Sequence, residues 1–181
     1  MTELELIQRT RQGDTNAFAD LVHLHQTGLF RVVQNLVPDR HAVEDLAQDV
    51  FLAAYRNLSR FDAARGSFRA WLFTIARNRC VNHGKRERLR KHDPIIDVSD
   101  HRNRGEALEQ QEFFQQLDIA LMELPFEQRA AFVLIELEQL SYQEAAQIEQ
   151  TEVGTIKSRV HRAKKKLKAS LASFACETRN E

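Results

Sequence analysis

The sequence contains few of the residues that stabilise small or turn-rich folds. Of 181 residues, 2 are cysteine, 3 are proline and 6 are glycine. Cys80 and Cys176 lie far apart with no CxxC or histidine-rich context, so neither a disulfide framework nor a zinc site is indicated. No run approaches the ~20 apolar residues of a membrane span, and the N-terminus lacks the apolar core of a signal peptide. We therefore expect a reduced, cytoplasmic protein.

The sequence motifs of common enzyme sites are also missing. The seven histidines and the acidic residues are scattered, with no HExxH, no GxSxG and no phosphate-binding loop. We therefore expect no catalytic residues, no cofactor and no metal.

The formal net charge is zero, but the charged residues are segregated along the chain. Residues 77–91 carry seven Lys and Arg against one acid, and residues 152–168 have the same balance. Between them, residues 106–149 carry ten acids and one base. Phosphate binding requires basic surfaces, so the two basic blocks are candidates for contact with nucleic acid.

Residues 140–168 predict two short helices around a tight turn. Ser141 and Glu144 have the spacing of a capping box, which predicts a first helix over about 142–148. Thr151 is a candidate N-cap for a second helix that reaches about residue 167. A stripe of residues at spacings of three and four gives this second helix its apolar face: Val153, Ile156, Val160, Ala163 and Leu167.

The other face of the second helix is polar and basic. It includes Lys157, Ser158, Arg159, His161, Arg162 and Lys165. Two helices, a three-residue turn and a basic outer face are typical of a helix-turn-helix, whose second helix enters the major groove of DNA. The alternative is an ordinary helical hairpin with a solvated charged face.

The rest of the chain predicts an all-α fold. Helices are expected over 3–12, 15–36, 41–58 and 106–123, and Ser67 is expected to cap a helix that follows the loop 61–67. Residues 89–105 have no periodicity and mark a linker. We therefore expect two small helical domains, with these bounds: 1–90, a linker at 91–107, 108–173, and a short tail at 174–181.

Two helices of the first domain carry polar faces. Asp45, Gln48, Asp49, Leu52 and Arg56 lie opposite the apolar stripe of the helix 41–58, and an apolar residue between carboxylates is a weak sign of a partner surface. The helix after Ser67 has a basic face with amides beside it, which suits an unstacked nucleic-acid strand: Arg77, Asn78, Asn82, Lys85 and Arg88. Trp71 and Phe73 are expected in its core.

Three quoted segments together resemble the bacterial sigma-70 family. They are DLAQDVFLAAYRNLSRF, SFRAWLFTIARNR and ELPFEQRAAFVLIELEQLSYQEAAQIEQTEVGTIKSRVHRAKKKL. The match is to the extracytoplasmic-function group, which keeps only the second and fourth sigma domains. The resemblance implies a promoter-specificity subunit of RNA polymerase that performs no bond chemistry.

The resemblance also implies a role for each polar face. The residues implied in docking on core polymerase are Asp45, Gln48, Asp49, Leu52 and Arg56. Those implied at the −10 element, in the base-capturing loop and on the opened strand, are Arg65, Ser67, Arg77, Asn78, Asn82, Lys85 and Arg88. Those implied at the −35 element are Lys157, Ser158, Arg159, His161, Arg162 and Lys165. An anti-sigma factor is the further partner that the resemblance implies.

Gln150 departs from the pattern, because many helix-turn-helix turns have glycine at this position. We therefore expect a less tight turn. A second function stays open beside the sigma factor: a stand-alone helix-turn-helix regulator that binds duplex DNA through residues 141–168 and uses residues 1–88 as a sensor or dimerisation domain.

Overall fold

The computed structural model describes the backbone of residues 1–90 and 108–177, and the side chains of residues 1–89 and 113–172. Every regular element in these ranges is helical, which confirms the expected all-α class. The predicted linker, 91–107, and the last four residues lie outside the described residues. In the same ranges, no helix has both the length and the apolar character needed to cross a membrane.

Four helices and one short 3-10 turn make up the first half of the chain. They are α1 (Glu3–Arg11), α2 (Thr15–Leu36), α3 (His41–Arg56), η1 (Leu58–Arg60) and α4 (Phe68–Arg90). Side chains fix where these helices begin. The Asp14 carboxylate accepts hydrogen bonds from two backbone N–H groups at the start of α2, and the Ser67 hydroxyl accepts one from Ala70 N at 3.2 Å at the start of α4.

The second half contains α5 (Leu108–Glu123), α6 (Phe126–Phe132), α7 (Tyr142–Glu149) and α8 (Val153–Glu177). A π-helical turn, η2 (Val133–Leu137), continues α6. The capping box of Ser141 and Glu144 is confirmed, since each side chain accepts a hydrogen bond from the backbone N–H of the other residue.

Two expectations about α8 were wrong. The helix begins at Val153, so Glu152 rather than Thr151 is the residue before it, and Thr151 N instead donates to Ala146 O at the end of α7. The helix also runs on to Glu177, ten residues beyond the predicted end at 167, so the expected tail is helical at its start. No proline or glycine follows Gly154 to stop the helix.

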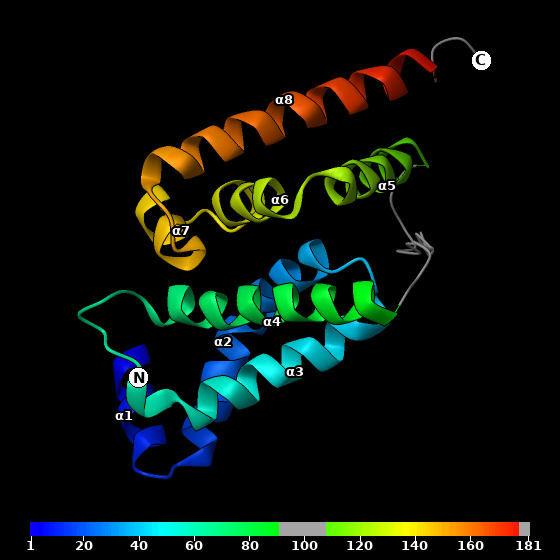
Figure 1. Ribbon diagram of the computed structural model, residues 1–181. Helices are drawn as coiled ribbons and strands as arrows, with labels where there is room; N and C mark the ends of the chain where they lie inside the picture. Colours follow the sequence, from blue (N-terminus) through cyan, green and yellow to red (C-terminus); the bar gives the residue numbers. More distant parts are fainter. Residues whose placement is uncertain (91–107, 178–181) are drawn as a thin grey trace.

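The two halves pack against each other as two layers (Figure 1). α4 runs beside α7, and α2 contacts α6, so the largest apolar cluster includes residues of both halves. Arg129 of α6 extends this contact, because its guanidinium donates to Leu36 O, at the end of α2, over 3.2 Å. A smaller cluster joins α5 to α8 through Leu121 and Leu167. α4 belongs to the first layer, with α2 and α3, and faces α7 of the second layer.

Candidate nucleic-acid interface

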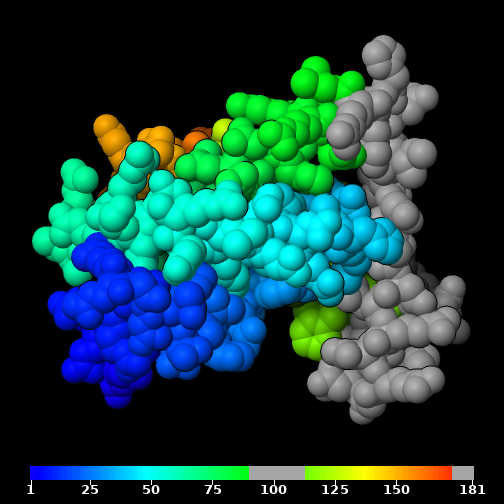
Figure 2. Space-filling view, turned by 90° about the horizontal axis from the view of Figure 1, so that it is seen from below, coloured from blue at the N-terminus to red at the C-terminus, as the bar shows by residue number. Residues whose placement is uncertain are grey.

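The outer face of α3 is open to solvent. Asp45, Gln48, Asp49, Leu52 and Arg56 are all exposed, as the sequence suggests, and the Leu52 side chain is 50% exposed. The inward stripe of the same helix is fully packed, with Val50 and Ala54 at 0% exposure. Figure 2 looks onto this side of the molecule, where α3 crosses the surface between α1 and α4. The structure therefore gathers all five residues on one accessible surface.

Sequence reasoning missed an aromatic residue near this surface. Tyr55 is 39% exposed and lies three positions after Leu52 on α3. Its ring packs on Phe18 of α2, with the centroids 4.9 Å apart, which fixes the orientation of the phenol. The signal was available, because residues three apart lie on neighbouring positions of a helix.

A hollow of about 320 Å³ lies between the end of α3 and α4. Its lining includes two of the predicted amides, Asn78 and Asn82, and three residues that the sequence did not single out, Asn57, Arg60 and Arg79. Two cations and three amides around an open hollow form a surface that can hold phosphates and base edges.

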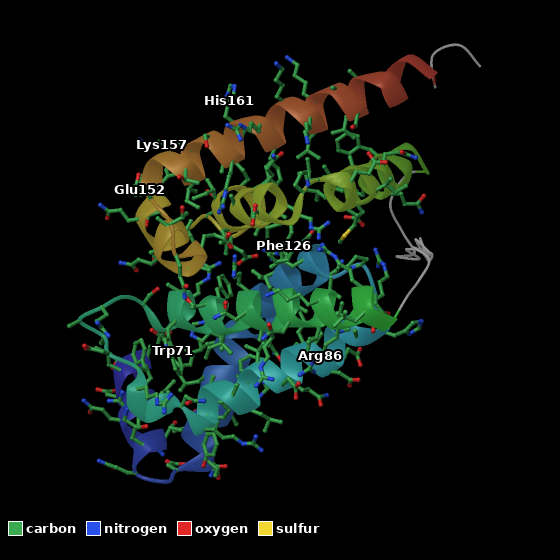
Figure 3. The ribbon with its side chains drawn as sticks, in the orientation of Figure 1. Trp71, Arg86, Phe126, Glu152, Lys157 and His161 are labelled. Atoms are coloured by element: carbon green, nitrogen blue, oxygen red, sulfur yellow. The ribbon has the colours of Figure 1, made fainter. Side chains whose placement is uncertain are left out.

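Trp71 also lines this hollow, so the expectation that it is a core residue was only half right. Its ring packs on Phe61 and Phe68 at centroid distances of 5.5 and 5.6 Å, while the residue as a whole is only half-buried. Phe73 is fully buried, as expected. Indole is large enough to contact the core with one face and a ligand with the other. Figure 3 shows Trp71 near the start of α4.

Two of the residues expected at the −10 element contact the second half of the chain. Arg77 Nε donates to Glu149 Oε1 over 3.1 Å, and the Ser67 hydroxyl donates to Glu144 Oε1 over 3.2 Å. The other five residues of that set, including the loop residue Arg65, are exposed. The set is therefore divided between five residues without such a contact and a pair, Ser67 and Arg77, that donate to carboxylates of α7.

Gln150 shapes the turn between α7 and α8. Its φ of 51° and ψ of 47° place it in the left-handed region, where glycine is the usual residue at a helix C-terminus. The expected looser turn is therefore wrong, because glutamine adopts the backbone conformation of the missing glycine. The cost of that conformation for a residue with a Cβ is about 1–2 kcal/mol.

The basic face of α8 points away from the rest of the molecule. Lys157, His161, Arg162 and Lys165 are exposed, and Figure 3 shows Lys157 and His161 on the outer side of the helix. On the opposite side Ile156 and Ala163 are fully buried. The exposed side chains project from successive turns of one helix, which is the arrangement that reads base edges in a major groove.

Ser158 and Arg159 depart from the expected arrangement on α8. The Ser158 hydroxyl donates to Thr155 O of its own helix over 2.9 Å. Arg159 Nη1 donates to Glu149 Oε2 over 3.2 Å, and its side chain is only 20% exposed. Arg159 therefore holds α8 against the end of α7, which is a structural contact that the sequence pattern could not distinguish from a phosphate contact.

Hydrogen bonds perturb the pKa of one residue at the boundary between the halves. Burial raises the pKa of Glu144, but hydrogen bonds from Ser141 and Ser67 and the nearby charge of Arg69 outweigh it, so the net shift is downward. Glu144 is therefore held as a carboxylate that serves both the cap of α7 and the contact with α4.

Family comparisons agree with this geometry. A family model described as Sigma-70 region 2 matches residues 21–90, and one described as Sigma-70, region 4 matches residues 114–167. The chain is 29% identical over 180 residues to the ECF RNA polymerase sigma factor SigW of Bacillus subtilis (strain 168), covering 91% of this chain and 94% of that protein. It is 32% identical over 176 residues to the ECF RNA polymerase sigma-E factor of Escherichia coli (strain K12), covering 91% of each.

A solved structure is similar over most of the chain. The sigma factor RpoE from Bartonella quintana, crystallised in complex with the anti-sigma factor NepR, gives a TM-score of 0.75 at 32% sequence identity. The similarity covers 86% of this chain and 96% of that one.

Proposed function

This chain belongs to the extracytoplasmic-function group of the sigma-70 family and directs promoter recognition by RNA polymerase, and we propose that three of its surfaces divide that task. The first surface is the outer face of α3, the second is the hollow beside α4 with the loop before it, and the third is the basic face of α8. The two domains that carry them are residues 1–90 and 108–173.

The outer face of α3 docks on core polymerase. Its carboxylates, Asp45 and Asp49, precede the exposed Leu52 on this face, and Arg56 follows it. The surface therefore combines an exposed apolar residue with two carboxylates that favour a basic partner. Burying a half-exposed leucine contributes affinity, and the surrounding charges set the orientation and the rate of association. Tyr55 adds a rigid aromatic side chain to the same contact.

The hollow beside α4 holds the opened strand of the −10 element. Asn78 and Asn82 donate to and accept from base edges, and Lys85 and Arg88 lie along the same helix for the phosphates. Trp71 offers an aromatic face on which an unstacked base can lie. The loop with Arg65 and Ser67 captures a base that has left the duplex.

The basic face of α8 reads the −35 element in the major groove. The exposed row of Lys157, His161, Arg162 and Lys165 is the single observation that carries the proposal, because it follows a capped helix and a tight turn. Arg162 is the strongest candidate for a bidentate contact with guanine. Ser158 and Arg159 support the helix in this arrangement more than they contact bases.

The similar sigma factor from Bartonella quintana, solved with an anti-sigma factor, supports a further proposal about regulation. An anti-sigma factor binds this chain and keeps it from polymerase. After the anti-sigma factor dissociates, this chain binds polymerase in the cytoplasm.

A stand-alone regulator, the alternative considered from the sequence, would bind a major groove through α8 without polymerase. A mobility-shift titration on a duplex promoter separates the two. The sigma-factor proposal expects little specific binding by the free chain and strong specific binding after core polymerase is added. Specific duplex binding of equal strength without polymerase would refute the proposal in favour of the regulator.

A further inference from the structure

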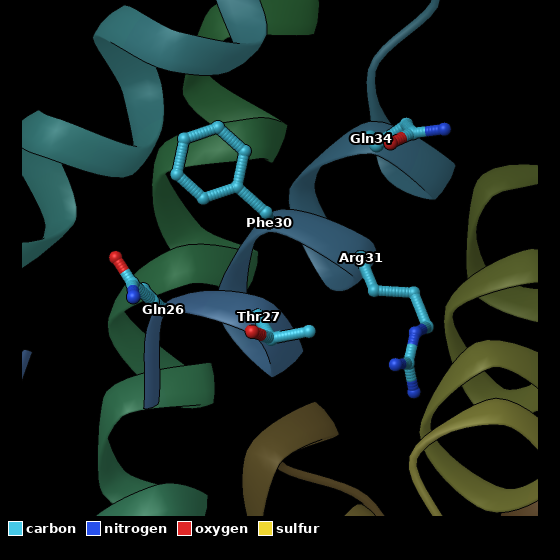
Figure 4. A pocket seen from close by; sticks show the side chains of 5 residues that line it. All are labelled: Gln26, Thr27, Phe30, Arg31 and Gln34. Carbon is cyan, nitrogen blue, oxygen red and sulfur yellow. The ribbon is translucent and has the colours of Figure 1, made fainter. Parts of the chain in front are cut away.

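Two buried carboxylates of the second half hold arginines of the first half. Glu138 follows η2 and is 1% exposed, and its oxygens accept hydrogen bonds from Arg31 of α2 and Arg69 of α4. The distance from Arg31 Nη1 to Glu138 Oε1 is 3.1 Å. Figure 4 shows Arg31 leaving α2 on the side opposite Phe30. Glu138 therefore has a guanidinium of the first half at each carboxylate oxygen.

Glu149 makes the second such contact, at the end of α7. Its side chain is 0% exposed, and Oε1 accepts from Arg77 of α4 over 3.1 Å while Oε2 accepts from Arg159 of α8. Arg77 also lies over the ring of Phe126, with the guanidinium carbon 5.9 Å from the centroid. One carboxylate thus joins an arginine of each half.

The backbone around Glu138 is shaped for this contact. The π-helical turn ends at Leu137, just before Glu138, and Gln139 has a φ of 55°, in the left-handed region. On the facing helix, α2 has Gly28, where an added Cβ would lie 3.0 Å from Glu138 Oε2. Irregular and strained backbone costs free energy, so it persists where the surrounding contacts stabilise it, and here those contacts include the one between Glu138 and α2.

Burial of these carboxylates is unfavourable unless cations neutralise them, and for Glu138 the cations come from the other half. We propose that Glu138 and Glu149, together with Arg31, Arg69 and Arg77, form a carboxylate latch that holds the chain in an autoinhibited, closed arrangement. The latch closes when the two halves meet. It opens when Arg31 and Arg69, which are 48% and 36% exposed, regain water and Glu138 becomes solvated.

Closure has a direct consequence for the surface beside α4. α7 lies against the start of α4, so Arg77 and Ser67 are engaged, and the loop glycine Gly66 lies near the side-chain oxygen of Gln147. A strand that uses Arg77 must first displace Glu149, so its apparent affinity equals the affinity of the open form multiplied by the fraction of molecules that are open. This inhibitory role rests on the proposed function of α4, whereas the latch itself does not.

Two variants of the full chain test the latch. Glu138→Gln removes the charge that holds Arg31 and Arg69. Gly28→Ala pushes on the Glu138 carboxylate without changing any charge, and it favours α2, because alanine is the better helix former. Glu136→Gln is the matched control, since Glu136 pairs with Lys164 of its own half over 2.8 Å.

Small-angle X-ray scattering and hydrogen exchange measure the opening without DNA or polymerase. We expect Glu138→Gln and Gly28→Ala to enlarge the radius of gyration and to speed amide exchange in α7 and at the start of α4, by about tenfold for Glu138→Gln and less for Gly28→Ala. Glu136→Gln should leave both unchanged. Wild-type scattering and exchange in both latch variants, or equal opening in the control, would overturn the latch.

Binding of a single strand carrying a −10 element tests the inhibitory role separately. We expect the two latch variants to bind the strand more tightly than the wild type, in proportion to their opening. Opening without tighter binding would overturn the inhibitory role, and a wild-type chain that does not bind the strand even with polymerase would instead refute the proposed function of α4.

Discussion

α4 and α8 are both long helices rich in arginine and lysine, but their cations differ in how many are paired with buried carboxylates. On α4, Arg69 and Arg77 turn toward the second half and pair with buried carboxylates. On α8, Arg159 pairs with Glu149 and Lys164 pairs with Glu136, whereas Arg162 and Lys165 project into solvent. Similar composition therefore gives one basic surface that is open to solvent and one that is partly paired with carboxylates. The difference comes from two buried carboxylates of the second half, Glu138 and Glu149, which accept the arginines of α4.

The largest expected effect concerns Cys80, which lies on α4 and is 3% exposed. Burial raises the pKa of its thiol from 9.0 to about 12, although the charge of Arg129 acts against this shift. In a Cys176→Ser background at pH 8, the thiolate should be roughly a thousand times rarer than in an exposed cysteine. Alkylation followed by mass spectrometry should therefore be slower by about that factor in the native chain than in urea.

The same thiol gives a pH dependence with a defined sign. Its pKa is higher in the folded chain, so the folded state keeps its proton while the unfolded state loses it above pH 9.0. The contribution of Cys80 to the free energy of unfolding is therefore complete below pH 9.0 and declines as the pH rises from 9.0 toward about 12. Rapid alkylation of native Cys80 would contradict the burial of this thiol.

The open face of α3 should respond strongly to a change of charge. Replacing Asp49 by arginine and Leu52 by alanine reverses one charge and removes the half-exposed side chain. We expect a loss of core-polymerase affinity of about 3 kcal/mol, or roughly a hundredfold, with unchanged helix content by circular dichroism. Undiminished co-purification with core polymerase would remove α3 from the docking surface. Glu44→Gln, an exposed change outside the docking set, is the control.

The exposed face of α8 should respond next. Arg162→Ala should reduce transcription from a promoter with an intact −35 element by about 1–3 kcal/mol, or ~5- to 150-fold, because it removes a bidentate contact with a base. A promoter library transcribed with reconstituted polymerase measures the change in upstream sequence preference. Lys168→Ala, at an exposed position farther along the helix, should change transcription much less. An unaltered preference in Arg162→Ala would exclude this residue from base reading.

The smallest effect concerns the turn that positions α8. Gln150→Gly relieves the left-handed conformation at φ 51°, so we expect about 1 kcal/mol more stability and a thermal midpoint ~2–4 °C higher. Differential scanning calorimetry measures the thermal midpoint of the variant and of the wild type. Gln147→Gly, in the helical part of α7, should destabilise instead. A destabilised Gln150→Gly variant would indicate that the glutamine side chain makes a contact that outweighs the strain.

Local patterns predicted the parts of the fold that depend on local interactions. The capping box at Ser141, the cap at Ser67 and the exposed polar face of α3 all follow from residues within a few positions of each other. The apolar stripe of α8 was likewise correct, with Ile156, Val160, Ala163 and Leu167 buried. The helical periodicity of the sequence is enough to fix such faces.

Contacts between the halves could not be predicted in the same way. Arg69 and Glu138 are 69 positions apart, and Arg77 and Glu149 are 72 positions apart. Nothing in the charge pattern of α4 distinguishes the paired Arg77 from the exposed Arg79, because both lie in the same basic block. The left-handed Gln150 and the π-helical turn before Glu138 were missed for a related reason, since tertiary packing overrides the local preference there.

Ser67 uses one hydroxyl group for two tasks. Its oxygen accepts the Ala70 N–H that begins α4, and its single proton goes to Glu144 of α7. The accepting and donating functions are separable, because a hydroxyl can rotate its proton without giving up its lone pair. When α7 moves away, the Ser67 hydroxyl can donate its hydrogen bond to another acceptor, such as a phosphate oxygen. The first turn of α4 therefore keeps its cap while this side chain exchanges one anionic partner for another.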